Sequence, residues 1–273
     1  MAAFTSEKKK EVNFITCPEA MDATAAKQLT ILSTEWLSSD ATLHLFDFKE
    51  VKTLANAAYK PIILFKRAVT AAQKTVCSIN MSPEILQQIQ DDGLDAIFTP
   101  CPSIHVAQKK AGIKMVGRVN PEFISPFVGA VQVALRVQAS TPVTAKTPFV
   151  KKEPYDTGVM IAAIISLVSE DFTGSIALCF PQAVFLDIYN NMLGEKATEI
   201  TKDIEDGAGE LLNIIFGLAK ANLNNQKGYT IQKAIPTVLT GEKLRISNSN
   251  TGTTVVLPFE TKVGMFFMEV VFT

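Results

Sequence analysis

The order of strand-like and helix-like runs changes near residue 100, and this change limits the folds that the chain can adopt. Before it, runs with strand periodicity at 11–16, 42–48 and 75–80 alternate with helix-like runs at 23–37 and 57–70. Strands that alternate with helices are typical of an α/β unit with a mixed sheet. The first hundred residues therefore predict an α/β domain.

Short signals mark where these helices begin and end. Asp22 stands directly before the first helix and can cap its free N–H groups. Ser82-Pro83 supplies a cap and a first-turn proline for a further helix, which Gly93 ends. The local signals thus agree with the alternating pattern.

The segment Pro100-Cys101-Pro102-Ser103 interrupts this pattern, and polar residues follow it as far as Lys114. Prolines close together stop regular structure, and polar stretches are typical of connections. We therefore predict a first domain at residues 1–102, a linker at 103–114 and a second domain at 115–273.

The second half has blocks of strands and helices instead of alternation. Asn120-Pro121 can open a helix that runs to about residue 137. The further predictions are strands at 159–168 and 175–180 joined by a turn at 171–174, helices at 182–193 and 204–224, and strands at 229–239, 244–247, 253–259 and 265–272. Consecutive strands with short turns predict an antiparallel sheet, and their apolar content predicts helices packed on one face. The expected fold is thus α/β in the first half and α+β in the second.

The last predicted strand, 265–272, is long and apolar. An unpaired strand of this kind exposes a row of backbone groups and is prone to pair with another chain. We expect its edge to be covered by a second copy, in a homodimer.

Composition excludes several function classes. Apolar residues make up 47% of the chain and charged residues 19%, as in globular proteins with a substantial core. The net charge of −1 and the pI of about 6.2 leave no electrostatic footprint for nucleic acid. Residues 1–16 carry no export signal, and the longest apolar run, 158–168, is too short to span a bilayer. We expect a cytoplasmic protein that does not insert into membranes.

Cysteine and histidine residues give no sign of a metal site. The four cysteines form no C-x-x-C pair, and only two histidines accompany them. Zinc sites need closer and more regular spacing. We therefore expect reduced thiols and no metal or other cofactor in this chain.

One predicted helix carries a polar stripe. At about 100° per residue, Asp206, Glu210, Asn213 and Gly217 fall on one narrow side of it. The expected core-facing residues on the opposite side are Leu211, Leu212, Ile215 and Leu218. A carboxylate, a carboxamide and a bare glycine backbone suit insertion into a partner's phosphate site better than simple solvation.

Residues of about 113–273 resemble the CheC/CheX family of chemotaxis phosphatases, and the CheX branch in particular. The resemblance rests on the Asp206-x₃-Glu210-x₂-Asn213 motif, on Gly209 inside it and on the later Pro236. The segment Gly217-Leu218-Ala219-Lys220 and the order of the hairpin, helix pair and final strands agree with it.

The resemblance implies an activity and roles for two residues. The family removes the phosphoryl group from an aspartate of phosphorylated CheY-type response regulators. By this resemblance, Glu210 pairs with the regulator's lysine and Asn213 holds the attacking water. Magnesium is expected only on the partner regulator. Asp206 is expected to be a helix-start residue that the helix dipole favours.

The CheC branch carries a second such motif on a related helix. In this chain that helix begins Asn120-Pro121-Glu122 and has Ser125 where an asparagine is required. A serine hydroxyl is too short to replace the carboxamide. We therefore predict one active site per chain and a structural role for this helix.

Residues of about 10–100 resemble a STAS domain, the fold of anti-sigma-factor antagonists. The matching stretches begin at Asp47, Ser82 and Gly93. Phosphoregulated members carry Asp-Ser-Ser-Gly where this chain has Ala-Asn-Ala-Ala, and Asn56 stands in place of the modified serine. The resemblance thus implies a docking or dimerisation module without a phosphoswitch.

A second function remains open. The two modules could bind a response regulator or a scaffold without hydrolysing anything, because the STAS-like half lacks its acceptor serine. The intact pair of Glu210 and Asn213 favours the enzyme, since a pure binder has no need of the amide. A classical hydrolase is less favoured than either, because no G-x-S-x-G or comparable nucleophile motif occurs and neither histidine stands in a recognisable catalytic motif.

Overall fold

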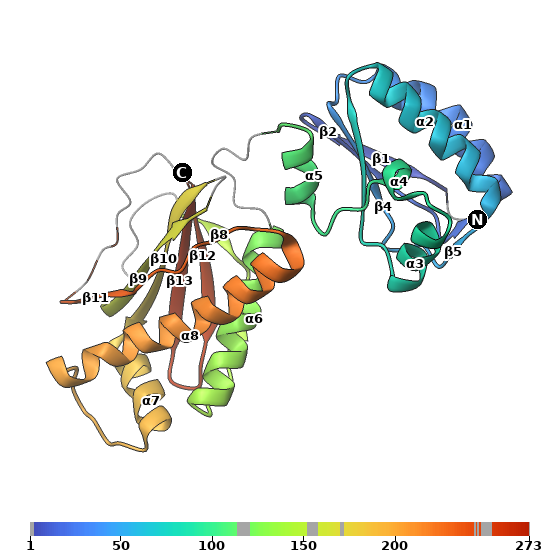
Figure 1. Cartoon of the computed structure of the whole chain (residues 1–273). Helices are drawn as coiled ribbons and strands as arrows, with labels where there is room; N and C mark the ends of the chain where they lie inside the picture. Colours follow the sequence, from blue (N-terminus) through green and yellow to red (C-terminus); the bar gives the residue numbers. More distant parts are fainter. Residues whose placement is uncertain are drawn as a thin grey trace. The chain divides into compact units, whose positions relative to one another are not determined.

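The computed structural model describes residues 3–113, 121–151, 158–169, 172–242, 244, 246 and 253–272. Its internal contacts divide the chain into two compact units, 1–114 and 115–273 (Figure 1). Three predicted features lie wholly or partly outside the described residues: the cap Asn120, the turn that begins at Asp171 and the strand 244–247.

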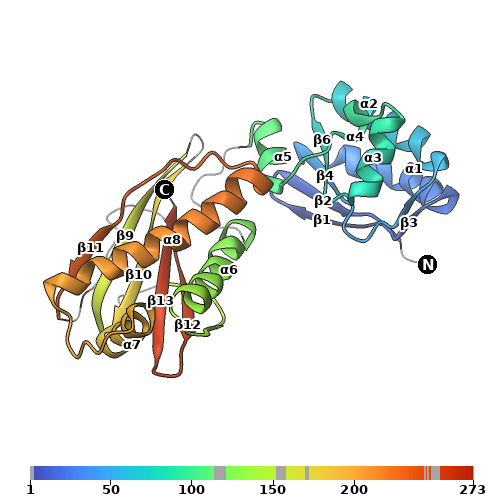
Figure 2. The same ribbon diagram turned by 60° about the horizontal axis from the view of Figure 1, so that its bottom comes forward.

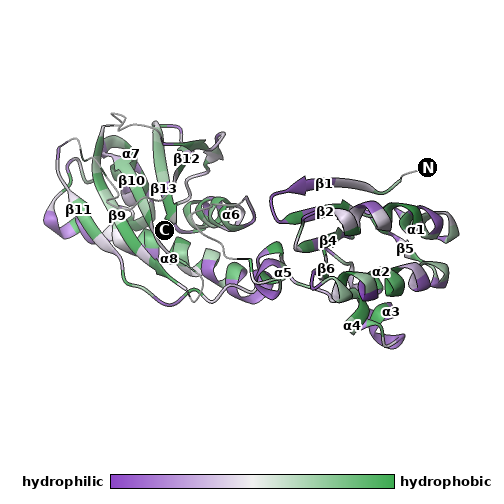
Figure 3. Cartoon of the chain, turned by 90° about the horizontal axis from the view of Figure 1, so that it is seen from above, coloured by the Kyte–Doolittle hydropathy of each residue, from purple (hydrophilic) through white to green (hydrophobic). Residues whose placement is uncertain are grey.

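The first unit contains a four-stranded mixed sheet in the order β1-β2-β4-β6. Its strands are β1 (Thr5–Lys9), β2 (Val12–Thr16), β4 (Leu43–Asp47) and β6 (Thr75–Ile79). The last three are parallel to one another, as the alternating pattern predicts, and β1 is antiparallel to β2. The sequence gives no sign of β1, because all five of its residues are exposed and hydrophilic (Figure 3). A separate two-stranded sheet joins β3 (Ala20–Met21) and β5 (Thr53–Leu54).

The first unit contains three helices that begin at or within two residues of the predicted positions and two short helices that the sequence analysis does not predict. They are α1 (Ala23–Ser38), α2 (Tyr59–Ala71), α3 (Pro83–Asp91), α4 (Asp95–Phe98) and α5 (Ile104–Lys110), with a 3₁₀ turn η1 (Asn56–Ala58) before α2. The Asp22 carboxylate accepts hydrogen bonds from the N–H groups of Thr24 and Ala25 at 2.8 and 3.0 Å. The Ser82 hydroxyl accepts from the N–H of Ile85. A mixed sheet with helices is the arrangement that the STAS resemblance implies.

The predicted linker 103–114 is wrong for most of its length, because it contains α5. Ser103 caps this helix by accepting from the N–H of Val106 at 3.2 Å. Ala107 is fully buried in a cluster with Leu43 and Leu45 of β4. This short helix and the residues after it contribute apolar side chains to one face of a small sheet, a pattern that the prediction of a polar linker overlooks: Ile104, Val106, Ala107, Ala111 and Ile113.

The second unit is built on a seven-stranded antiparallel sheet, which confirms the predicted α+β class. The strand order is β11-β9-β10-β13-β12-β7, and β8 also pairs with β12. The strands are β7 (Thr144–Ala145), β8 (Phe149–Val150), β9 (Val159–Val168), β10 (Thr173–Pro181), β11 (Thr237–Thr240), β12 (Thr254–Glu260) and β13 (Met265–Phe272).

Helices α6 (Pro121–Gln138), α7 (Gln182–Leu193) and α8 (Lys202–Lys227) pack against one face of this sheet (Figure 2). Alternate residues of β9 decide which face is covered: Ile161 and Ile165 belong to the core under the helices, whereas Ala162 belongs to a small cluster on the other face. Gly194 ends α7 and Gly228 ends α8, both with positive φ, as predicted.

The sequence analysis expects the strand 265–272 to have an exposed edge that a second copy covers. This expectation is wrong, because β13 is not an edge strand. Met268 pairs with Leu178 of β10 on one side and with Leu257 of β12 on the other. Strand order in a sheet does not follow chain order, so the length and apolar content of a strand cannot tell whether it lies at an edge.

The predicted strand 229–239 is also largely wrong, because only Thr237–Thr240 pairs in the sheet. Residues 229–236 form no regular element, although Tyr229 and Ile231 are 2% exposed. The Tyr229 ring lies 5.2 Å from that of Phe123 on α6. The apolar residues of this segment therefore fill the core under the helices and do not indicate a strand.

The buried imidazole of His44 makes the first unit sensitive to acid. His44 on β4 is fully buried, and burial lowers its pKa to about 4, with Lys74 contributing. The unfolded chain takes up this proton from pH 6.5 downward and the folded unit only near pH 4, so stability falls as the pH falls between these values. We expect the free energy of unfolding to drop by about 2 kcal/mol between pH 7 and pH 5 on account of His44 alone.

Urea unfolding followed by Trp36 fluorescence measures this, because the single tryptophan lies in the core of the first unit. His44→Gln keeps a polar side chain but cannot be protonated, so it should lose about 2 kcal/mol less than the wild type over the same interval. An equal loss in both proteins would contradict the assignment.

Candidate functional site

Helix α8 exposes the stripe that the sequence predicts. Asp206, Glu210, Asn213 and Gly217 are all exposed. The residues of the opposite side, Leu211, Leu212 and Ile215, are 0–1% exposed in the core.

Leu218 does not belong to the buried side, and that prediction is wrong. Its side chain is 43% exposed and lines an open groove between α6 and α8. The groove has a volume of about 460 Å³, and α6 presents the small residues Gly129 and Ala130 to it. The Leu218 side chain therefore points toward α6, but the side chains that α6 presents at this point are too small to cover it.

Gly209 allows the chain after α8 to lie directly against the helix. A Cβ at Gly209 would be 3.1 Å from Cγ2 of Val238 and 3.8 Å from Cβ of Pro236. The sequence links Gly209 and Pro236 only through the family resemblance. The structure gives the physical reason, which is that a glycine in the motif seats Pro236 and edge strand β11 against the helix beside Glu210.

Two further contacts hold the same half of α8. Oγ1 of Thr240 donates to Oε1 of Glu205 at 3.0 Å and ties the end of β11 to the first turn of the helix. A Cβ at Gly207 would be 2.8 Å from Cδ2 of Tyr189, so the α7 ring packs against the helix at that point. The sequence carries one signal for these contacts, namely two glycines two positions apart in a helix. Such a pair costs helix stability unless neighbours approach closely.

The Glu210 carboxylate makes no ion pair or hydrogen bond within the described part of the chain. It stands on an acidic side of α8 with Asp203 and Asp206. A fixed, solvated carboxylate of this kind can pair with a cation on a partner without first breaking an internal contact. Asn213 lies three residues further along the same side, within about 6 Å at the Cβ atoms.

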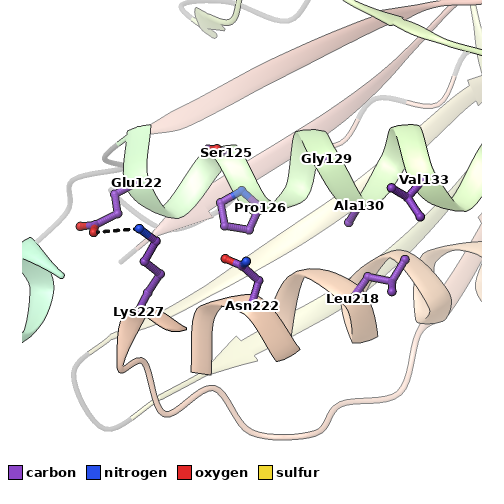
Figure 4. A pocket seen from close by; sticks show the side chains of 9 residues that line it. All are labelled: Glu122, Ser125, Pro126, Gly129, Ala130, Val133, Leu218, Asn222 and Lys227. Atoms are coloured by element: carbon purple, nitrogen blue, oxygen red, sulfur yellow. Dashed lines mark ion pairs between the residues drawn. The ribbon is translucent and has the colours of Figure 1, made fainter. Parts of the chain in front are cut away.

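Helix α6 has the glutamate of such a site but not the asparagine. Ser125 is exposed, and Glu122 is partly buried with its carboxylate 3.7 Å from Nζ of Lys227 (Figure 4). The acidic group is thus engaged within the unit, and the amide is absent. This agrees with the predicted structural role of the helix.

No group of three or more His, Cys, Asp or Glu side chains among the described residues could hold a metal ion. Within the same residues, no helix is long and apolar enough to cross a membrane.

A family model described as "Chemotaxis phosphatase CheX" matches residues 161–260. A chemotactic CheC-like protein from Shewanella oneidensis MR-1, known from its crystal structure, is 34% identical and matches with a TM-score of 0.52 over 57% of this chain and 100% of that one. The chain belongs to the CheC/CheX family. A CheC-like superfamily protein from Shewanella sp. PV-4 is 30% identical over 57% of this chain and 99% of that one, with a TM-score of 0.53.

CheX from Vibrio vulnificus gives 28% identity and a TM-score of 0.53 over 56% of this chain and 99% of that one. The search of curated proteins found no match. The share covered by these CheC/CheX structures corresponds in length to the second unit.

The same substitution at two glycines of α8 should destabilise the second unit to different extents. Gly209→Val should destabilise the second unit by about 1–3 kcal/mol more than Gly217→Val, because a Cβ at Gly217 meets no atom within 4 Å. The intrinsic helix cost of valine is the same at both positions, so their difference isolates the contact with β11.

Urea unfolding of both variants followed by circular dichroism measures this difference. Trp36 fluorescence identifies the transition of the first unit, which should not move. Equal stabilities of the two variants would show that β11 does not rest on Gly209.

Proposed function

We propose that the second unit hydrolyses the aspartyl phosphate of a CheY-type response regulator. The observation that carries the proposal is the exposed pair of Glu210 and Asn213 on α8, a helix that packs against β11 and α7. Membership of a family described as chemotaxis phosphatases supports the reaction class.

Glu210 acts in docking. Its carboxylate forms a charge-assisted hydrogen bond with the lysine of the regulator's active site. This contact orients α8 and brings Asn213 beside the phosphoryl group. Because Glu210 has no internal partner among the described residues, no ion pair has to be broken on docking.

Asn213 positions the attacking water. Its amide oxygen accepts a hydrogen bond from the water and its NH₂ group can donate to a phosphoryl oxygen. The water attacks phosphorus as the bond to the aspartate oxygen breaks, and the products are inorganic phosphate and the free aspartate. An aspartate at position 213 would add negative charge beside an anionic group, so the amide is the better residue. Catalysis is thus positioning with electrostatics.

Magnesium belongs to the partner in this scheme. The motif offers Asp206 and Glu210 as its only carboxylates on the exposed stripe, and one of them is committed to the lysine. A metal held by the regulator would supply the charge that neutralises the phosphoryl oxygens, and the proposal assigns no cofactor to this chain.

The first unit serves in this proposal as a docking or dimerisation module. Asn56 is exposed at the start of η1 and has no hydroxyl group to phosphorylate. A homodimer remains an expectation, but a sheet contact made through the second unit would have to involve β11 or the short strands β7 and β8, since β13 is internal. Light scattering of the full chain at micromolar concentration decides between a monomer and a dimer.

The alternative function is regulator binding without hydrolysis. In this function Glu210 is still required for binding the regulator, but the amide of Asn213 has no role. Substitution of these two residues therefore separates the two functions.

Asn213→Ala should lower turnover of a phosphorylated CheY-type receiver on the order of 10²-fold while binding is retained, because only the positioning of water is lost. Glu210→Ala should lose both binding and turnover. The measurement is phosphate release from the receiver after phosphorylation by phosphoramidate, with the affinity titrated separately.

Ser125→Ala is the matched control, since it alters the corresponding position of α6 and should leave turnover unchanged. If the wild type does not accelerate phosphate release from any receiver of the same cell, the enzyme proposal fails. If Asn213→Ala retains full turnover, the assigned role of the amide fails.

A further inference from the structure

Two of the four cysteines lie beside each other in the first unit. Cys77 is the middle residue of β6, and Cys101 belongs to the segment after α4 that runs along the edge of β6. The N–H of Cys101 donates to the carbonyl oxygen of Ser78 at 2.8 Å, which holds this segment against the strand. Both cysteines are buried in one apolar cluster between the sheet and α5. The Cys77 thiol donates a hydrogen bond to the sulfur of Cys101.

The backbone of Thr99 directs the segment back along β6. Its φ of 48° lies in the left-handed region, which branched side chains rarely adopt. Thr99 Oγ1 accepts a hydrogen bond from Nζ of Lys66 at 3.0 Å. The Thr99 carbonyl accepts from the N–H of Ser78 at 3.2 Å and from the Cys101 thiol at 3.5 Å. Strain of this kind persists only where the surroundings hold it, and here the strained residue brings one thiol against the other.

The two thiols differ in access. Cys77 is 0% exposed, whereas Cys101 is 6% exposed and lines an open cavity of about 740 Å³. Lys110 of α5 and Thr99 line the same cavity. A small molecule in the cavity can therefore reach the sulfur of Cys101 but not that of Cys77.

The surroundings also divide the chemistry between the two thiols. The hydrogen bond from Cys77 lowers the pKa of Cys101 against the opposing effect of burial, and the charges of Lys110 and Lys66 act in the same direction as the hydrogen bond. The same hydrogen bond and burial raise the pKa of Cys77. Because the thiolate is the nucleophile, Cys101 is the group that reacts first, and Cys77 is a neutral thiol in contact with it.

The other two cysteines have no such neighbour. Cys17 lies in the cluster of the first unit that contains Trp36, and Cys179 lies in a small cluster of the second unit. Neither cluster contains a second cysteine, and burial raises the pKa of both thiols. They serve as internal references for an unreactive thiol.

We propose that Cys77 and Cys101 form a peroxide-sensitive dithiol that closes to an intrachain disulfide. The Cys101 thiolate attacks one oxygen of hydrogen peroxide, the O–O bond breaks and hydroxide leaves, so that Cys101 becomes a sulfenic acid. The Cys77 sulfur then attacks the sulfur of Cys101, the S–O bond breaks, and water leaves with the Cys77 proton. Two thiols are oxidised to one disulfide, and one peroxide is reduced to two molecules of water.

The disulfide ties the segment after α4 to the sheet. A sulfur–sulfur bond of about 2.05 Å requires the two thiols to move closer than a hydrogen bond holds them. Residues 101–103 can supply this movement, because they belong to no helix or strand. Helices α3 and α4 lie between the two cysteines in the chain and are enclosed in the covalent loop. The inference concerns the first unit and does not rest on the proposed function.

The test is a peptide map of the full chain. The reduced protein is treated with hydrogen peroxide at pH 7 and then denatured in iodoacetamide, and its tryptic peptides are identified by mass spectrometry. We expect a linked pair of peptides that contain Cys77 and Cys101, with the loss of two hydrogen atoms, while Cys17 and Cys179 are alkylated. Cys101 should lose its thiol at least about tenfold faster than either reference cysteine. Dithiothreitol should restore all four thiols.

Three variants test the roles of the two thiols. In Cys77→Ala the reaction should stop at the sulfenic acid of Cys101, which dimedone traps. In Cys101→Ala the thiol of Cys77 should stay reduced. Cys179→Ala is the matched control and should form the disulfide at the rate of the wild type.

Several results would overturn the inference. Four alkylated cysteines, after a treatment that fully oxidises free cysteine, show that there is no reactive dithiol. A bond that joins other cysteines or two chains contradicts the pairing, and a dimedone adduct on Cys77 contradicts the order of the two steps. If Trp36 fluorescence shows that a variant does not fold, the peptide map of the wild type still decides the pairing.

Discussion

The contact between Gly209 and the segment after α8 is the constraint on which the second unit depends. It allows edge strand β11 to lie against the helix at Pro236 and Val238, and the hydrogen bond between Thr240 and Glu205 closes the same contact at its end. A helix held in this way cannot rotate about its own axis without expelling the strand. The exposed direction of Glu210 and Asn213 is therefore a property of the sheet edge as much as of the helix that carries them.

Much of this fold is accessible from the sequence, for reasons visible in particular residues. Asp22 and Ser82 cap the helices that follow them, because a side-chain oxygen close to free N–H groups is a local matter. Gly194 and Gly228 likewise end helices through their own conformation. The polar stripe of α8 follows from helical geometry alone, and its exposure agrees with the prediction.

The predictions from the sequence are wrong where contacts with residues distant in the chain determine the structure. The exposed strand β1 has no apolar pattern, and α5 has only a short one, because each covers little core. The position of β13 inside the sheet depends on β10 and β12 and not on its own residues. Leu218 has the spacing of a core residue, but its exposure is set by the small residues of α6. The role of Pro236 is invisible until Gly209 is seen beneath it.

The ion pair between Glu122 and Lys227 has a consequence for stoichiometry. Counting acidic motifs on helices would suggest two equivalent sites for a regulator on this unit. Because Glu122 is paired within its own chain, the proposed function leaves one site for a regulator on each unit. One site per chain would give turnover a simple hyperbolic dependence on regulator concentration, and cooperativity would then require an assembly of several chains.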